Sequence, residues 1–301
     1  MSAPAVSYPD SPSAHGANTV DLEHHSRDSL KNSNEGANEW LDKVYVYRVV
    51  ALGILLSLTW KIRYLPFFWH HYDLIPLHDD FFPSMMQKSL TWAGFQLLPI
   101  ALIITAFFVT DRRYLLLQGW LTGVCMLGLC WHQLSYNDVT FLTCLWVSLW
   151  SIWYLHRMKE PAATLYPKAA KLVTLIFSMI LLGGAVGKLT PGYWSGEVFY
   201  EIYFAQREFW IFSLLRQNLS QEMLTTVACY YSRFVIITEV AGAGLWLLPP
   251  RLACALGIAI FLSIALFSNT NLFSVMCCLL GLGLVGLHQP RSLRIDKVKG
   301  S

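Results

Sequence analysis

Charged residues are scarce in this chain of 301 residues: lysine, arginine, aspartate and glutamate together make up 14% of it. A soluble domain typically carries about 25%. With 55% hydrophobic residues and a mean hydropathy of +0.44, the composition is that of a polytopic membrane protein. The net charge is only +3, and the basic residues lie in short loops, so no nucleic-acid partner is indicated.

The seven cysteines lack the spacing of a metal site and fall almost entirely within apolar runs, so we interpret them as small packing residues. A cleavable signal peptide is not expected, because no basic stretch near the N-terminus is followed at once by an apolar one. Residues 1–40 are rich in Ser, Pro, Ala, Asn and Gly without a hydrophobic period. We expect them to form a disordered cytoplasmic tail.

Eight apolar segments predict an all-α fold, a polytopic membrane helical bundle of about eight spans within residues 41–289. The segments cover residues 44–60, 90–110, 114–131, 139–156, 171–189, 227–248, 252–268 and 271–287. The last two are interpreted either as two tilted spans or as one broken, re-entrant element. Residues 290–301 would form a basic cytoplasmic tail.

Basic residues set the expected orientation, because cytoplasmic loops carry an excess of lysine and arginine. With residues 1–40 inside, that face has thirteen: Lys43, Arg48, Arg112, Arg113, Arg157, Lys159, Lys168, Lys171, Arg251, Arg291, Arg294, Lys297 and Lys299. The outer or lumenal face has seven: Lys61, Arg63, Lys88, Lys188, Arg207, Arg216 and Arg233. Eight spans then leave both termini cytoplasmic, in a membrane whose type the sequence does not specify.

Lys188 is the residue that most needs an explanation, because it ends the apolar segment 171–189. A cation there is costly unless it is paired, hydrated or functional. It either snorkels to the interface beside Tyr193 and Trp194 or belongs to a site. Gly183 and Gly187 also form a small-xxx-small pair, which is typical of helix packing.

Glu239 is the second ionisable group inside a predicted span. Helical rise places it about 10 Å away in depth from Lys188, so a direct pair is expected only with a tilted helix or a bridging group. A structural hydrogen bond and a proton-handling role both remain open. His132, in a short outer loop, is either an ordinary loop residue or a group that joins Lys188 in one pocket.

Two outer loops add weaker candidates. The first contains His70, His71 and His78, but their spacing matches no ligand pattern, and no metal is predicted. The second interleaves aromatic and charged residues around Trp210, which indicates amphipathic helices on the membrane surface, either passive or covering a lipid or quinone entrance. Asn269 and Asn271 interrupt an apolar run, a pattern found where backbone lines a cavity.

Three stretches resemble the membrane domain of the vitamin K-dependent gamma-carboxylases, also called the HTTM (horizontally transferred transmembrane) domain. Residues 184–189 followed by Trp194-Ser195-Gly196 are similar to its Gly-Lys-Leu then Trp-x-Gly signature. The stretch from Glu239 to Arg251 resembles its acidic, glycine-rich span, and residues 269–274 resemble its Asn-x-x-Leu-Phe-Ser segment. With Tyr47-Arg48 opening the first span, the resemblance covers about residues 44–287.

The resemblance implies that Lys188 is a base that deprotonates a reduced quinone, and that oxygen-dependent epoxidase or carboxylase chemistry follows. Glu239 and His132 complete the candidate catalytic set, and the candidate substrate contacts are Trp194, Tyr193, Asn269, Asn271 and Trp210. The family's lumenal domain has no counterpart in this sequence, and its catalytic histidine has no clean one, since His132 is only nearby.

Two alternatives therefore stay open beside a lipid-phase enzyme. One is a non-catalytic membrane factor for the maturation or export of a secreted peptide, such as a bacterial toxin. The other is a quinone-binding subunit of the DoxX-like kind. Membrane lipid is an expected partner in each case.

Overall fold

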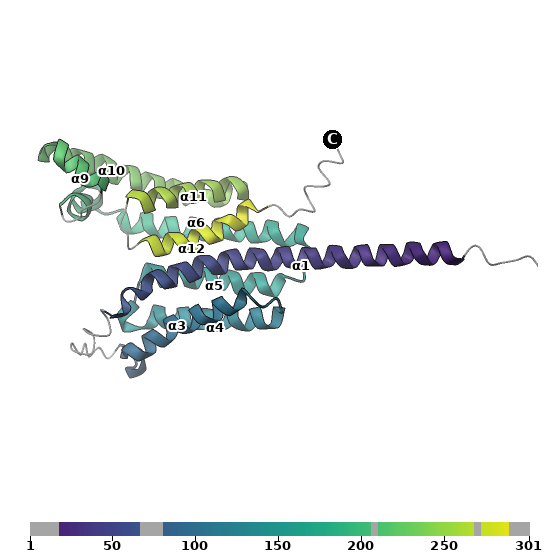
Figure 1. Ribbon diagram of the computed structural model, residues 1–301. Coiled ribbons are helices and arrows are strands. Elements are labelled where there is room, and N and C mark those ends of the chain that lie inside the picture. Colours follow the sequence, from purple (N-terminus) through teal and green to yellow (C-terminus); the bar gives the residue numbers. More distant parts are fainter. Residues whose placement is uncertain (1–17, 67–80, 206–209, 268–271, 289–301) are drawn as a thin grey trace, which may run out of the picture. The chain divides into compact units, whose positions relative to one another are not determined.

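The computed structural model describes residues 18–66, 81–205, 210–267 and 272–288 (Figure 1). Within these ranges the chain forms helices and no strand, which confirms the expected all-α fold. The chain divides into two compact units, residues 1–42 and 43–301. This division falls close to the expected end of the N-terminal tail at residue 40.

Helix α1 (Asn18–Ile62) runs through the division between the units. Its first part lies in the segment that we expected to lack regular structure, so the structure differs from that expectation. Residues 18–35 contain neither proline nor glycine. A helix already nucleated in the apolar half can extend through Gly36 and these residues because each added residue also adds a backbone hydrogen bond, and the missing hydrophobic period does not prevent it.

The second unit has a helix at each predicted apolar segment. These are residues 43–62 of α1, α3 (Ser89–Ala106), α4 (Arg112–Trp131), α5 (Val139–Arg157), α6 (Ala162–Lys188), α10 (Gln221–Gly242), α11 (Pro250–Phe267) and α12 (Phe273–Leu287). In the described part of the chain, the four helices α3 to α6 are long and apolar enough to cross a membrane, and α11 and α12 contain shorter apolar stretches. Four such helices indicate a membrane protein.

Shorter elements connect these helices: η1 (Ser84–Gln87), η2 (Gln133–Ser135), α7 (Pro191–Ser195), α8 (Glu197–Phe199), η3 (Tyr200–Ala205), α9 (Trp210–Asn218) and η4 (Leu245–Leu247). The connection between α6 and α10 is the most elaborate. Phe204 and Phe212 form a small core there with Leu224 and Ala228 of α10. This part of the chain therefore packs onto the beginning of α10.

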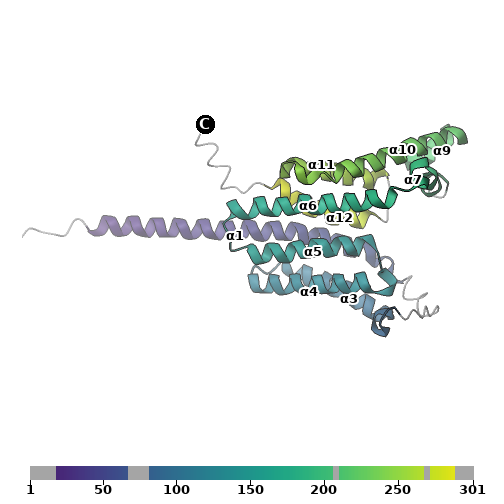
Figure 2. The same ribbon diagram turned by 180° about the vertical axis from the view of Figure 1, so that it is seen from behind.

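In the second unit, residues 43–62 of α1 lie along the junction of two groups of helices, α3 to α5 and α6 with α10 to α12 (Figures 1 and 2), and α5 also contacts α6 and α12 directly. The buried side chains of this part recur at helical spacing: Val44, Tyr47, Val50, Ala51, Ile54 and Leu58. At Gly53, an added Cβ would lie 2.8 Å from the carbonyl oxygen of Cys277 and 3.2 Å from the Cα of Gly281. Glycine thus lets α1 and α12 pack backbone to backbone.

Candidate functional site

Lys188 and Glu239 form an ion pair in the structure. The Lys188 Nζ lies 2.9 Å from Oε1 and 2.8 Å from Oε2 of Glu239, so the amine donates to both carboxylate oxygens. It also lies 3.4 Å from the carbonyl oxygen of Gly184, in the last turn of α6, where the helix dipole favours a cation. The exposed fraction of the side chain is 25% for Lys188 and 8% for Glu239, so the carboxylate is the more deeply buried partner.

The direct contact is one of the outcomes that the sequence left open, since the difference in depth of about 10 Å expected from helical rise allowed a direct pair only with a tilted helix or a bridging group. That expectation placed the beginning of the glutamate helix level with Lys188. Instead, the first turns of α10 extend past the end of α6, and α7 packs against them (Figure 2). The Ser232 hydroxyl donates to the carbonyl of Tyr193 at 2.6 Å, and the Arg233 Nε donates to the carbonyl of Trp194 at 3.1 Å. Glu239, two turns further along α10, therefore lies level with Lys188 without a bridging group.

Two glycines make this arrangement possible. A Cβ on Gly184 would lie 3.2 Å from both Cδ and Oε2 of Glu239, so the carboxylate rests directly over this glycine. Gly196 has a φ of +84°, and a Cβ there would lie 2.4 Å from the Cα of Cys229. Glycine adopts this left-handed conformation without strain, and the chain can turn back against α10 at this point.

The ion pair borders an apolar cavity of about 570 Å³. Its walls include Trp146 of α5, Met179 of α6, Phe261 of α11 and Val275 of α12. Lys188 and Glu239 are the charged residues among its described lining. A largely apolar cavity with a few convergent polar groups, and with a volume of about 300–1,000 Å³, is the usual form of a small-molecule site.

Glu239 also borders a second cavity, of about 250 Å³, between α10 and α11. Its lining includes the hydroxyl-bearing residues Tyr231, Thr238 and Ser263. Glu239 and Ile264 line both cavities, so the carboxylate stands between them.

The candidate substrate contacts predicted from the sequence do not all gather at this cavity. Tyr193 and Trp194 lie in α7, just after Lys188, and the Arg233 guanidinium is 5.4 Å from the centre of the Trp194 ring. Neither residue is part of the cavity lining. Trp210 begins α9, but its side chain, like Asn269 and Asn271, lies outside the described part of the structure.

His132 lies apart from the ion pair and does not line the cavity. The amide of Leu134 donates to its Nδ1 at 3.2 Å, so the ring proton is on Nε2, which lies 3.0 Å from the carbonyl of Lys88. The side chain is fully buried. Burial lowers the pKa of His132, and the bond to Lys88 opposes this effect. Both ring nitrogens are therefore used to hold the turn after α4, and His132 does not join Lys188.

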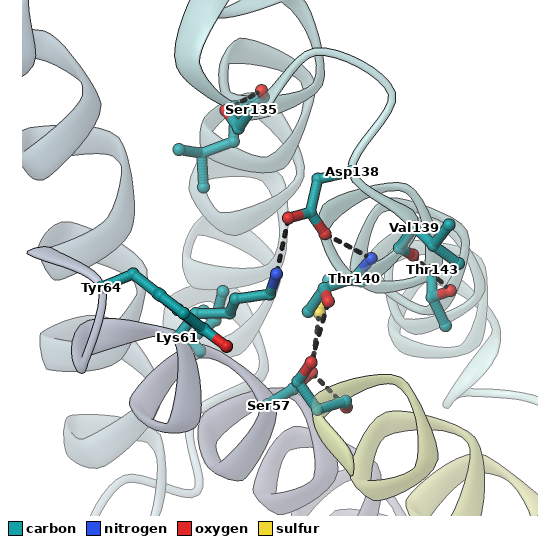
Figure 3. A network of polar contacts seen from close by, with 12 residues as sticks. Ser57, Lys61, Tyr64, Ser135, Asp138, Val139, Thr140 and Thr143 are labelled. Carbon is teal, nitrogen blue, oxygen red and sulfur yellow. Dashed lines mark hydrogen bonds and ion pairs between the residues drawn. The ribbon is translucent and has the colours of Figure 1, made fainter. Parts of the chain in front are cut away.

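Sequence reasoning missed a second ion pair, between Lys61 of α1 and Asp138 (Figure 3). The Lys61 Nζ donates to Oδ2 at 2.6 Å, while Oδ1 accepts from the amide of Thr140 at 2.8 Å and caps α5. The Lys61 amine also lies 5.4 Å and 5.8 Å from the ring centres of Tyr64 and Phe141. Lys61 and the short loop that contains His132 and Asp138 were both expected on the outer face, and this shared position was the signal that could have linked the two charges.

Three buried hydroxyls connect this network to α12. The Ser57 hydroxyl donates to the carbonyl of Ser274 at 2.5 Å, and the hydroxyls of Thr140 and Ser274 lie 2.8 Å apart. Ser274 ends the stretch that resembles the Asn-x-x-Leu-Phe-Ser segment. It fixes the beginning of α12 to α1 and α5, next to Val275 and Met276 in the cavity wall.

Among the described residues, no group of three or more His, Cys, Asp and Glu is placed to hold a metal ion. The loop with His70, His71 and His78 lies outside these residues. Comparison with known proteins gave no match to a protein-family model, a curated protein or a solved structure.

Proposed function

We propose that the Lys188–Glu239 pair and its cavity bind an amphipathic, hydroxyl-bearing ligand of the reduced-quinone class within the membrane. The observation that carries this proposal is a pair of charges at 2.8 Å on the edge of a largely apolar cavity of about 570 Å³. The apolar walls suit the body of such a ligand, and the pair suits its hydroxyl group. Reduced quinones combine these two features.

The pair is equipped to accept a proton from a hydroxyl group. Glu239 takes the proton on a carboxylate oxygen as the ligand's O–H bond breaks, and Lys188 holds the oxyanion that remains. The apolar surroundings strengthen both interactions because they exclude water. The resemblance implies that Lys188 itself is the base. In this proposal the two residues share that role, because Glu239 accepts the proton and Lys188 is the cation that stabilises the oxyanion. This is the first step of the enzyme hypothesis raised by the sequence.

The experiment compares Lys188→Ala with the exchanged variant Lys188→Glu/Glu239→Lys, each purified with native lipid beside the wild type. Lys188→Ala leaves a buried carboxylate unpaired, which costs about 3–5 kcal/mol for buried pairs, and we expect the low end because Lys188 is partly exposed. The exchanged variant keeps the opposite charges together, so its Tm should recover towards that of the wild type.

Quinol binding separates a ligand site from a purely structural pair. The proposal predicts that the exchanged variant recovers stability but not quinol affinity, because the carboxylate no longer occupies its buried position on α10. If naphthoquinol and ubiquinol fail to bind the wild type, or bind the exchanged variant equally well, the pair is structural. A membrane factor for peptide maturation is then the better interpretation.

We also infer that the chain crosses the membrane eight times and that both termini are cytoplasmic. This inference is supported by eight helices of the described structure, which coincide with the eight apolar segments. Two of them, α1 and α10, extend beyond their apolar segments into polar residues. The excess of lysine and arginine in alternate loops gives the orientation. The ligand site then lies near the outer or lumenal face, at the end of α6.

A further inference from the structure

The cavity is elongated along α6. Its lining on this helix extends from Lys188 down to Ile176. The twelve residue steps between them correspond to about 18 Å at 1.5 Å per residue. Charge is found at one end, beside Glu239, while Met179 and Ile180 in between are apolar. A ligand that fills this space has a polar head at the pair and an apolar tail parallel to the helices.

The end of the cavity far from the ion pair is closed by two packed aromatic rings, those of Phe261 and Phe177, which we call the aromatic floor. Phe261 lines the cavity, its side chain is 2% exposed, and its ring packs edge-on against Phe177 at a centroid distance of 5.0 Å. Phe177 in turn fits against Gly257 and Gly283, where added Cβ atoms would lie 2.4 Å and 3.1 Å from its ring. With aromatic rings fixed against backbone on two helices, the floor has little room to move.

The middle of the cavity has space at one particular residue. Gly183 lines the cavity, and a Cβ added to it would meet no atom within 4 Å. Gly187, one turn further along α6, also meets nothing within 4 Å but is not part of the cavity lining. The chain therefore offers two exposed glycines with open space beside them, one in the cavity lining and one outside it.

We propose that the cavity limits the length of its ligand's single alkyl or prenyl tail, and that Phe261 is the residue that sets the limit. The inference rests on the proposed function, in which the head lies at Lys188 and Glu239. Tails that end before Phe261 gain contact with each added methylene group. Longer tails have to bend or displace the aromatic floor, so their affinity stops rising.

The test measures binding of a series of quinols that share one ring and carry unbranched tails of increasing length, using the full chain in lipid nanodiscs. Gly183→Leu places a side chain in the path of the tail and should weaken the longer quinols about tenfold, as expected for an overpacked site, while it leaves the shortest unchanged. Phe261→Leu should move the limit to longer tails. Gly187→Leu is the matched control and should keep the wild-type profile.

Partition of the tail into lipid is the same for every variant, so it cancels when each variant is compared with the wild type at one tail length. If quinols bind but Gly183→Leu and Phe261→Leu leave the length profile unchanged, the length limit is wrong and the proposed function stands. If no quinol of any length binds the wild type, the proposed function itself fails. Should Phe261→Leu not fold, the wild-type series decides: an affinity that stops rising at a fixed tail length supports the limit, and an affinity that rises with every added methylene group overturns it.

Discussion

At the scale of single residues, Gly183 and Gly184 are neighbours on α6 with different surroundings. A Cβ on Gly184 would press on the Glu239 carboxylate at 3.2 Å, whereas a Cβ on Gly183 would enter open space. Alanine stabilises a helix interior by about 1 kcal/mol relative to glycine. We therefore expect Gly183→Ala to hold or raise the Tm, and Gly184→Ala to be less stable than it by about 1–2 kcal/mol.

Thermal unfolding of the two variants in the same lipid tests this expectation, with quinol affinity as a second measurement. The helix propensity term is equal for both, so their difference reports the contact with Glu239. Equal stability and equal affinity would mean that the carboxylate moves aside freely, and that its position over Gly184 is not required.

The buried imidazole of His132 should make the free energy of unfolding depend on pH. Burial holds its pKa below the ordinary value of 6.5, so the unfolded chain binds a proton more readily than the folded chain as the pH falls. The stability that this residue contributes is therefore fully present above pH 6.5 and is lost as the pH falls through the lowered pKa.

The measurement is the Tm of the wild type and of His132→Gln from pH 7.5 down to pH 5. A glutamine can still donate to the carbonyl of Lys88 but does not titrate in this range, so its Tm should fall less on acidification. Parallel pH profiles for the two proteins would contradict the assignment of His132 as a buried neutral residue.

At the scale of elements, the contact between α1 and α12 depends on Gly53 and Gly281. A Cβ on Gly53 would lie 2.8 Å from a backbone oxygen, which cannot rotate away as a side chain can. Gly53→Ala should separate the two helices and cost about 1–3 kcal/mol. Gly94→Ala in α3, where nothing lies within 4 Å, is the control and should gain up to about 1 kcal/mol. A Gly53→Ala protein as stable as the control would show that the helices adjust without cost.

At the scale of the whole molecule, the orientation of the helices is the main prediction. A reporter inserted in the connection between α5 and α6, near Lys159, should be cytoplasmic, and one inserted after Asn218, before α10, should be external. Alkaline phosphatase fusions distinguish the two sides because the enzyme is active only outside the cytoplasm. Activity at both positions, or at neither, would contradict an orientation set by the basic residues.

The sequence predicts the positions of the helices well, because each apolar segment is long enough to be recognised by hydropathy alone. Their ends are less predictable. Helix α6 begins at Ala162 and continues through Lys168 and Lys171, since a helix end at an interface does not need apolar residues. For the same reason α10 begins at Gln221, earlier than its apolar segment.

These end effects explain which parts of the site could be predicted. Lys188 and Glu239 stand out in the sequence as charges within apolar runs, but their contact depends on how far α10 extends past α6. The pair of Lys61 and Asp138 depends in the same way on two helix ends that meet in space. The apolar lining looks like any other membrane helix in the sequence, because nothing local distinguishes a wall of a cavity from a face that packs.

The ion pair has a consequence for biosynthesis. Glu239 is separated from Lys188 by 51 residues along the chain. A ribosome working at about 5–20 residues per second needs roughly 3–10 seconds to cover this distance. During that interval the newly inserted α6 carries a lysine whose partner has not yet been made. The insertion machinery has to shelter this charge, or the helix has to wait near the lipid headgroups, until α10 arrives and the bundle closes.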